Sequence, residues 1–375
     1  MGRRRVFRRA GDWSASDGGI VCVLTLTSLT ALAIGIARAA DQSRARSPTS
    51  ASASEPVTRQ APELYTCLAV AADLSPVFPT DLFLPTKEMT VSFRLADGEA
   101  HRKMECRWVA LDAGPEAANG GEFGKGSLEL KGSTAGAFRL SGLSKAMPPG
   151  NYRVDVVADG APWKSKTFRV EPSSKLEGVE KPDDLMPLGQ AKTWSYDFVQ
   201  EAGGDAKVIL DDVAPDADGK FRAAVTMTDA GRDTGDSAEH FELRRNGKLV
   251  FQEWFAVDKH GVSSVRRKTP DGTVTVDPPQ PLWPWPVTDT PRHWTYSPKD
   301  KSYKLAGTMW GPLPIATPSG ARPGFIVMYQ QSQGVAELTV ERHFVPGVGL
   351  VSETVINAVN HKMVGRQEMT LRAMP

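Results

Sequence analysis

Tryptophan is the residue type whose placement most suggests a binding site. Five of the nine tryptophans lie close together in the sequence: Trp254, Trp283, Trp285, Trp294 and Trp310. Flat aromatic surfaces suit sugars, lipids or extended peptides when they line a concave pocket. The alternative is that Trp283 and Trp285 close the open end of a curved sheet, because burying a large ring is strongly favourable. We take the five as candidate ligand-binding residues.

The other chemically capable residues lack a recognisable spacing. The six histidines are His101, His240, His260, His293, His343 and His361. None forms the close pair that makes a zinc site recognisable. The acidic loop at 211–219 has an Asp-x-Asp-Gly run but lacks the closing ligand of a calcium loop. The sequence therefore predicts no catalytic residue, metal or cofactor. A serine, histidine and aspartate that meet only in the fold remain the alternative.

The basic residues are unevenly distributed. Five arginines crowd residues 3–9, residues 18–37 carry no charge, and Ala37-Arg38-Ala39 follows. A basic start, an apolar run and an A-x-A site are typical of a secretory signal peptide, here residues 1–40. An uncleaved membrane anchor is the alternative, because twenty apolar residues can just span a bilayer. We therefore expect an exported protein of the periplasm or cell envelope, with secretion also open.

The overall charge disfavours nucleic acid as a partner. The 375 residues carry a formal net charge of +1, and loss of residues 1–40 leaves a slightly acidic chain. Binding to phosphates requires a basic surface. That loss also leaves Cys67 and Cys106 as the only cysteines. An oxidising compartment permits a disulfide between them, and two separate buried thiols are the alternative.

Polar segments divide the chain into two predicted β domains. Residues 41–61 contain no aromatic residue and are expected to form a flexible linker. Residues 62–172 alternate apolar and polar side chains, as in Met89, Val91, Phe93 and Leu95, and predict a sandwich. Residues 173–186 are polar and are expected to be a second linker. Residues 187–375 show roughly ten strand-like runs, which predict a curved antiparallel sheet or a partly open barrel.

The first domain carries one local resemblance. Residues 147–170, MPPGNYRVDVVADGAPWKSKTFRV, resemble the closing hairpin of an immunoglobulin-like or fibronectin-like sandwich. In such domains a tyrosine hydroxyl bonds back to the backbone of the preceding corner. Tyr152 stands at that position. The resemblance predicts an immunoglobulin-like sandwich with this tyrosine corner.

The second domain contains a short internal repeat and a proline-rich segment. Trp194-Ser195-Tyr196 and Trp294-Thr295-Tyr296 each place two rings on one face of a strand, so the two halves of the domain are expected to begin with equivalent strands. Residues 277–286, DPPQPLWPWP, lack the donors that a central strand needs. We expect them to form a long connection across a sheet face.

The two Trp-Ser/Thr-Tyr segments, together with residues 253–262 and 344–353, carry a wider resemblance. The chain resembles exported bacterial β-rich proteins of unknown function, including the TapB-type pilus-biogenesis lipoproteins. Phe344, Gly347, Val348 and Gly349 match a strand start that recurs in that group. The resemblance implies a curved antiparallel sheet and an envelope location, and it carries no catalytic residues. The chain departs from the lipoprotein members because it has no lipobox.

The sequence favours a non-catalytic envelope protein. Its C-terminal β domain is expected to bind a protein partner or an apolar or glycan ligand. It meets the membrane only through the signal segment, if that is uncleaved. A hydrolase that acts on an envelope polymer, with a site assembled only in three dimensions, is the alternative. A purely structural spacer is the third possibility.

Overall fold

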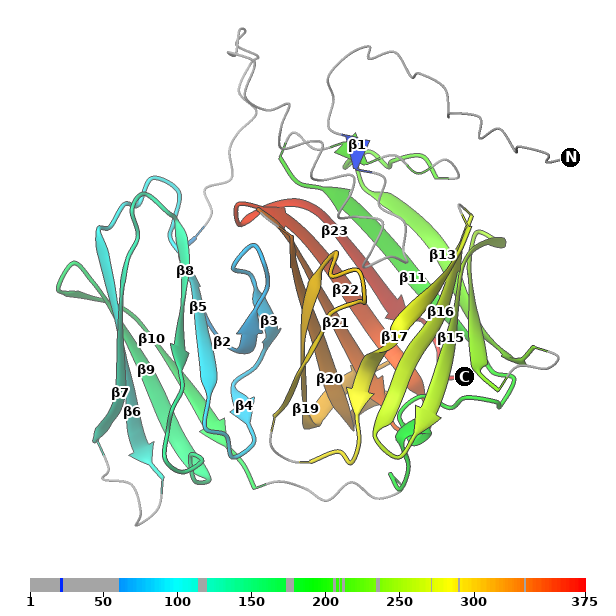
Figure 1. Cartoon of the computed structure of the whole chain (residues 1–375). Helices are drawn as coiled ribbons and strands as arrows, with labels where there is room; N and C mark the ends of the chain where they lie inside the picture. The colour runs from blue at the N-terminus through cyan, green and yellow to red at the C-terminus, as the bar shows by residue number, and fades with distance from the viewer. Residues whose placement is uncertain are drawn as a thin grey trace, which may run out of the picture.

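The computed structural model describes residues 21–22, 61–113, 120–172, 179–204, 207–208, 210, 213–233, 237–270, 272–288, 291–333 and 335–375. Across these residues the protein is all-β, with a smaller sandwich beside a large curved sheet (Figure 1). The predicted signal peptide and first linker lie outside the described residues, except for residue 61 and β1 (Val21–Cys22). Strand β1 pairs in parallel with β12 (Lys207–Val208). In the described part of the chain, no helix is long and apolar enough to cross a membrane.

Two antiparallel sheets form the sandwich. One contains β3 (Pro76–Pro79), β2 (Glu63–Val70), β5 (Met89–Arg94) and β8 (Ala135–Leu140), in that order. The other contains β4 (Leu82–Phe83), β10 (Ala161–Val170), β9 (Gly150–Ala158), β6 (Lys103–Asp112) and β7 (Glu122–Glu129), with β4 pairing in parallel. The Tyr152 hydroxyl donates a hydrogen bond to the Pro148 carbonyl over 2.6 Å, as predicted for the tyrosine corner. Burial raises the pKa of Tyr152 to about 12.

The predicted disulfide between Cys67 and Cys106 is wrong, because both cysteines are free and buried. Cys106 lies on β6 and packs into the sandwich core beside Trp108. Cys67 lies on β2 and shares a face with Ala69, which packs against the core of the large sheet instead. Because alternate side chains of a strand share one face, the Cys67 sulfur lies on the face of β2 that points away from the sandwich core holding Cys106.

The second module is a twelve-stranded antiparallel sheet that curls almost into a closed barrel, and this confirms the predicted curved sheet. We call it the barrel-like sheet. Its first meander consists of β11 (Thr193–Ala202), β13 (Phe221–Arg232), β14 (Glu239–Arg245), β15 (Lys248–Asp258), β16 (Gly261–Thr269) and β17 (Gly272–Pro284). Its second consists of β18 (Arg292–Tyr296), β19 (Lys304–Thr317), β20 (Gly320–Gln333), β21 (Ala336–Val345), β22 (Gly349–Val359) and β23 (Lys362–Leu371). The first and last strands, β11 and β23, pair with each other and join the two meanders.

The repeated Trp-x-Tyr pattern lies in the first strand of each meander. Trp194 and Tyr196 open β11, and Trp294 and Tyr296 open β18. Tyr196 donates its hydroxyl to the Leu350 carbonyl over 2.8 Å. Trp294 lies flat on Gly307 of β19, where a Cβ would sit 2.1 Å from the indole. The glycine therefore leaves the space that this ring occupies.

Side-chain hydrogen bonds connect the β17 edge of the sheet to its β18 edge, and we call this boundary the seam. No backbone ladder joins these two among the described strands, and one backbone bond, from Lys299 N to Asp277 O, spans 2.9 Å. Tyr296 donates to the Pro278 carbonyl over 2.9 Å, and Tyr303 donates to Gln280 Oε1 over 3.2 Å. Tyr329 donates to the Leu282 carbonyl. We call these three tyrosines the seam tyrosines.

The proline-rich residues 277–286 were expected to cross a sheet face, and that expectation is wrong. Residues 277–284 belong to β17, which pairs with β16 on one side and lies at the edge of the sheet. Proline is compatible with an edge strand because its missing N–H can face away from the ladder. Register shifts on either side of Ser263 and Ser264 accommodate the irregular pairing.

The segment between the two modules closes one end of the barrel-like sheet. Helix η1 (Pro182–Asp184) is followed by Leu185 and Met186, both buried in the core. The Trp283 indole donates to the Pro182 carbonyl over 3.1 Å. Gly347 N donates to the Asp184 carbonyl over 3.0 Å. Part of the expected linker is therefore a plug, which we define as residues 182–186.

The sandwich docks on the outer wall of the barrel-like sheet through the turn after β2. Ala72 N donates to Thr339 Oγ1 over 3.0 Å, and Gln330 Nε2 donates to the Val70 carbonyl over 2.9 Å. His361 Nδ1 lies 3.0 Å from the Ala72 carbonyl. These contacts place strands of the sandwich against β20, β21 and the β22–β23 turn.

Candidate functional site

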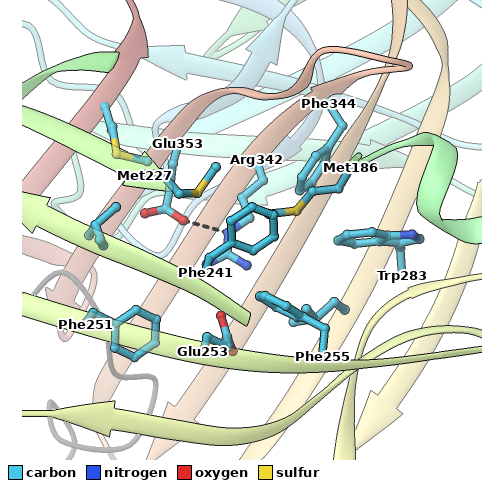
Figure 2. A pocket seen from close by; sticks show the side chains of 13 residues that line it. Met186, Met227, Phe241, Phe251, Glu253, Phe255, Trp283, Arg342, Phe344 and Glu353 are labelled. Atoms are coloured by element: carbon cyan, nitrogen blue, oxygen red, sulfur yellow. Dashed lines mark hydrogen bonds and ion pairs between the residues drawn. The ribbon is translucent and has the colours of Figure 1, made fainter. Parts of the chain in front are cut away.

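A small cavity lies inside the barrel-like sheet, next to the plug (Figure 2). Its volume is about 60 Å³, which is room for a few water molecules. Three methionines and five aromatic rings supply most of its wall: Met186, Met227, Met369, Phe241, Phe251, Phe255, Trp283 and Phe344. Three charged side chains, Glu253, Arg342 and Glu353, also line it. The cavity is therefore apolar with charge at one place on its wall.

Two buried ion pairs, contributed by different parts of the barrel wall, bring this charge inside. Glu253 of β15 is directly opposite Arg267 of β16, and Arg267 Nε lies 2.8 Å from Glu253 Oε1. Arg342 of β21 is directly opposite Glu353 of β22, and Arg342 Nε lies 2.6 Å from Glu353 Oε2. Figure 2 shows Glu253 pointing toward Arg342 and Glu353. We call these four residues the charge quartet.

The charges of the quartet stabilise one another. Burial works to raise the pKa of Glu253, but Arg267 and Arg342 hold that pKa below its ordinary value. Burial opposes the charge of Arg342, but Glu353, Tyr329 and Glu253 raise its pKa above the ordinary value. Both shifts favour the ionised forms of Glu253 and Arg342. Ion pairs of this kind are costly to bury, and their replacement by well-packed apolar residues is often neutral or stabilising.

Buried amides extend the polar wall beyond the cavity. On β11, Gln200 shares its face with Phe198, which lies opposite Met369 of the cavity wall. Gln200 is fully buried, and so is Asn357 of β22, two residues beyond Val355 on the inward face. Among the described residues, neither amide nitrogen nor amide oxygen of these two side chains finds a hydrogen-bond partner. Burying such groups unpaired is unfavourable.

The predicted tryptophans are distributed over different surfaces. Trp283 is in the wall of the interior cavity, bonded to the plug and packed on Phe344 at 5.0 Å between ring centroids. Trp294 is an inward ring at the seam. Trp285 follows β17 and is half-buried, with its backbone N–H bonded to His260. Trp310 lies on the outer wall, facing the sandwich.

Trp254 belongs to a separate stack on the outer face of β15. His240 stacks on its ring at 5.0 Å, and the Arg266 guanidinium lies 4.1 Å from the ring centroid. The indole nitrogen donates to Asp233 over 2.9 Å. The structure thus does not gather the five tryptophans into one pocket.

A larger cleft, of about 530 Å³, separates the sandwich from the outer wall of the barrel-like sheet. Trp310 and Met328 line it from the sheet. A chain of polar contacts crosses it: His293 Nδ1 lies 3.0 Å from Thr308 Oγ1, and His293 Nε2 lies 2.7 Å from Glu88 Oε1. Burial works to raise the pKa of Glu88, but Arg139 and His293 lower it below the ordinary value.

The described residues contain no group of three or more histidine, cysteine or acidic side chains placed to hold a metal ion. In the acidic loop, Asp216 instead accepts hydrogen bonds from the backbone of Asp218 and Lys220, at 3.0 and 2.9 Å. Its other oxygen pairs with Arg222 at 2.8 Å. These contacts make Asp216 the anchor of a turn.

Sequence reasoning missed the charge quartet. One signal was available: Glu253 stands between Phe251 and Phe255 on the same face of a strand, and Arg342 stands between Val340 and Phe344. A charge flanked on its own face by apolar residues indicates an inward position. The partners come from neighbouring strands, and the meeting of the two pairs depends on how the sheet curls.

Comparison with known proteins adds no relative. The chain matches no protein-family model, no curated protein and no solved structure.

Proposed function

We propose that this is a non-catalytic binding protein of the bacterial envelope whose barrel-like sheet takes up an apolar chain in its interior. The observation that carries the proposal is the cavity walled by methionines and rings at the plugged end. Ligand sites are typically concave and mostly apolar, with a few convergent polar groups. The envelope location rests on the signal-peptide pattern of residues 1–40.

The methionines explain how a small cavity can admit a larger ligand. Met186, Met227 and Met369 approach it from the plug, β13 and β23. Methionine is unbranched and flexible, so it repacks around ligands more readily than other apolar residues do. Met186 also belongs to the plug, so outward movement of the plug enlarges the same space. The ligand therefore replaces side chains rather than filling an existing void.

Calorimetric titration with single-chain C12 amphiphiles, each below its critical micelle concentration, tests this function. Leu243 lines the cavity, and Leu243→Trp should abolish binding by occupying the space. Leu130→Trp is the matched control, because Leu130 is a buried leucine of the sandwich core that does not line the cavity. Absence of binding to the wild-type protein by every C12 probe would refute the proposal. Equal loss of binding in both variants would refute the location.

A hydrolase is the second candidate, and one observation favours it. Thr308, His293 and Glu88 form a hydroxyl–imidazole–carboxylate chain in the cleft between the modules. Such a chain can activate a hydroxyl as a nucleophile, with the carboxylate orienting the imidazole. Turnover of nitrophenyl esters that disappears in both Thr308→Val and His293→Gln would establish this function. Turnover that survives both substitutions would exclude this chain as its source.

A further inference from the structure

The buried amides specify what kind of polar group the interior accommodates. Gln200 and Asn357 are fully buried, and their nitrogens and oxygens lack partners within the described part of the chain. Gln331 of β20 is also buried, and its amide oxygen is likewise unpartnered. A side-chain amide offers two N–H donors and an acceptor oxygen. This part of the wall therefore presents amide donors and acceptors beside one buried cation, Arg245 of β14, whose guanidinium lies over the Phe198 ring at 6.0 Å.

The strand register places these amides just beyond the interior cavity. Met369 of the cavity wall is opposite Phe198, and the next inward pair along the same two strands is Gln367 with Gln200. The following inward position on β23 is Gly365, which lies opposite Asn357. Gly365 contributes no side chain to this part of the wall. An extended ligand that leaves the cavity in this direction meets the amides first.

The charge quartet does not call for a charged ligand. Each member already has an oppositely charged partner, at 2.8 Å for Glu253 with Arg267 and 2.6 Å for Arg342 with Glu353. A ligand carboxylate would have to compete with Glu353 for Arg342, and a ligand ammonium would have to compete with Arg267 for Glu253. Within the described residues, the unsatisfied groups named above are instead neutral amides. Neutral hydroxyl or amide groups match them without leaving a charge unpaired.

We infer that the interior holds a neutral, hydroxyl-rich head group of a single-chain amphiphile against Gln200 and Asn357, with the apolar chain among the methionines. Glycerol and sugar heads have this chemistry. The inference rests on the proposed function, because the chain must occupy the cavity for its head to reach the amides. Beyond that function, it predicts how the affinity of amphiphiles with the same chain length depends on their head group.

Three C12 probes compare head groups: glycerol monolaurate, dodecanoate and dodecyltrimethylammonium. Calorimetry on the full chain should give the glycerol ester the lowest Kd, by about tenfold, since two net hydrogen bonds of about 1 kcal/mol each are worth at least that factor. Asn357→Leu and Gln200→Leu should each remove this preference and leave dodecanoate binding unchanged. Replacement of an unpaired buried amide by an apolar residue is not expected to unfold the protein.

The matched control is Gln252→Leu. Gln252 is a buried glutamine of β15 whose neighbour Glu253 points inward, so its own side chain lies on the outer face. Its amide donates to Glu242 over 3.0 Å. This substitution should leave the ranking of probes intact. A wild-type protein that binds all three probes equally, or prefers a charged one, would overturn the inference while the proposed function stands. Binding of no probe would overturn both.

Discussion

Arg267 and Glu253 face each other across neighbouring strands inside the barrel-like sheet, with Nε and Oε1 2.8 Å apart and both residues less than a tenth exposed. Arg342 and Glu353 form the matching pair elsewhere on the wall. Arg342 also influences Glu253 electrostatically, so the two pairs act as one network.

Removal of one member of this network should be more harmful than removal of a pair. We expect Arg342→Met to lower the free energy of unfolding by about 3–5 kcal/mol, because Glu353 is left buried without its partner. Arg342→Met combined with Glu353→Gln should recover most of that loss. Urea denaturation measures both. Arg366→Met is the control: Arg366 and Glu368 are more than a third exposed, and loss of such a pair should change stability by less than about 1 kcal/mol.

Acid should destabilise the barrel-like sheet through Glu253. The pKa of Glu253 is lowered in the folded protein, so its contribution is fully present above the unfolded pKa of about 4.3 and is lost as pH falls through the folded value. Urea midpoints measured from pH 6 down to pH 3 should therefore decline. Glu253→Gln should be less stable near neutral pH and should show a flatter decline. An identical pH dependence in both proteins would contradict this role.

The seam tyrosines should control how easily β17 detaches. Tyr329→Phe removes the hydroxyl that bonds the Leu282 carbonyl, and Tyr303→Phe removes the bond to Gln280. Amide hydrogen exchange at Leu282 and Trp283 should be faster in both variants. Tyr196→Phe removes an equivalent hydroxyl bond, to Leu350, away from the seam. That control should leave exchange in β17 unchanged, and faster exchange there in all three variants would argue against a local effect.

Both sandwich thiols should react only after unfolding. Cys67 and Cys106 are free and fully buried, and burial raises the pKa of Cys67 to about 12 and that of Cys106 further. Iodoacetamide should leave both unlabelled in the native protein and label both in urea without a reductant. Peptide mass spectrometry reads each site separately. An unlabelled pair in unreduced urea would mean that a disulfide forms after all.

Local patterns of the sequence predicted the strands and the tyrosine corner correctly. Alternation identified buried faces such as that of Met89, Val91 and Phe93, and the Pro-Gly turn before Tyr152 identified the corner. Both features depend on residues near one another in the chain. The pairing of Cys67 with Cys106 failed because it required knowing which face of β2 turns toward the large sheet.

The candidate site was beyond prediction for a related reason. Glu253 and Arg342 come from strands 89 residues apart in the numbering, and only the curling of the sheet directs both into one interior. The tryptophans were visible in the sequence, but their surroundings were not. Trp283 lies in the wall of the interior cavity and bonds to the plug, whereas Trp254 stacks with His240 and Arg266 on the outer face. The sequence shows which residues are candidates for a site, but strand register decides whether each side chain lies on the inner or the outer face of the sheet.

The strand order also dictates when the fold can be completed during synthesis. The first meander leaves β11 with an unpaired edge until β23, residues Lys362–Leu371, arrives beside it as the last strand of the second meander. Both meanders must therefore be synthesised before this edge is protected from pairing with another molecule.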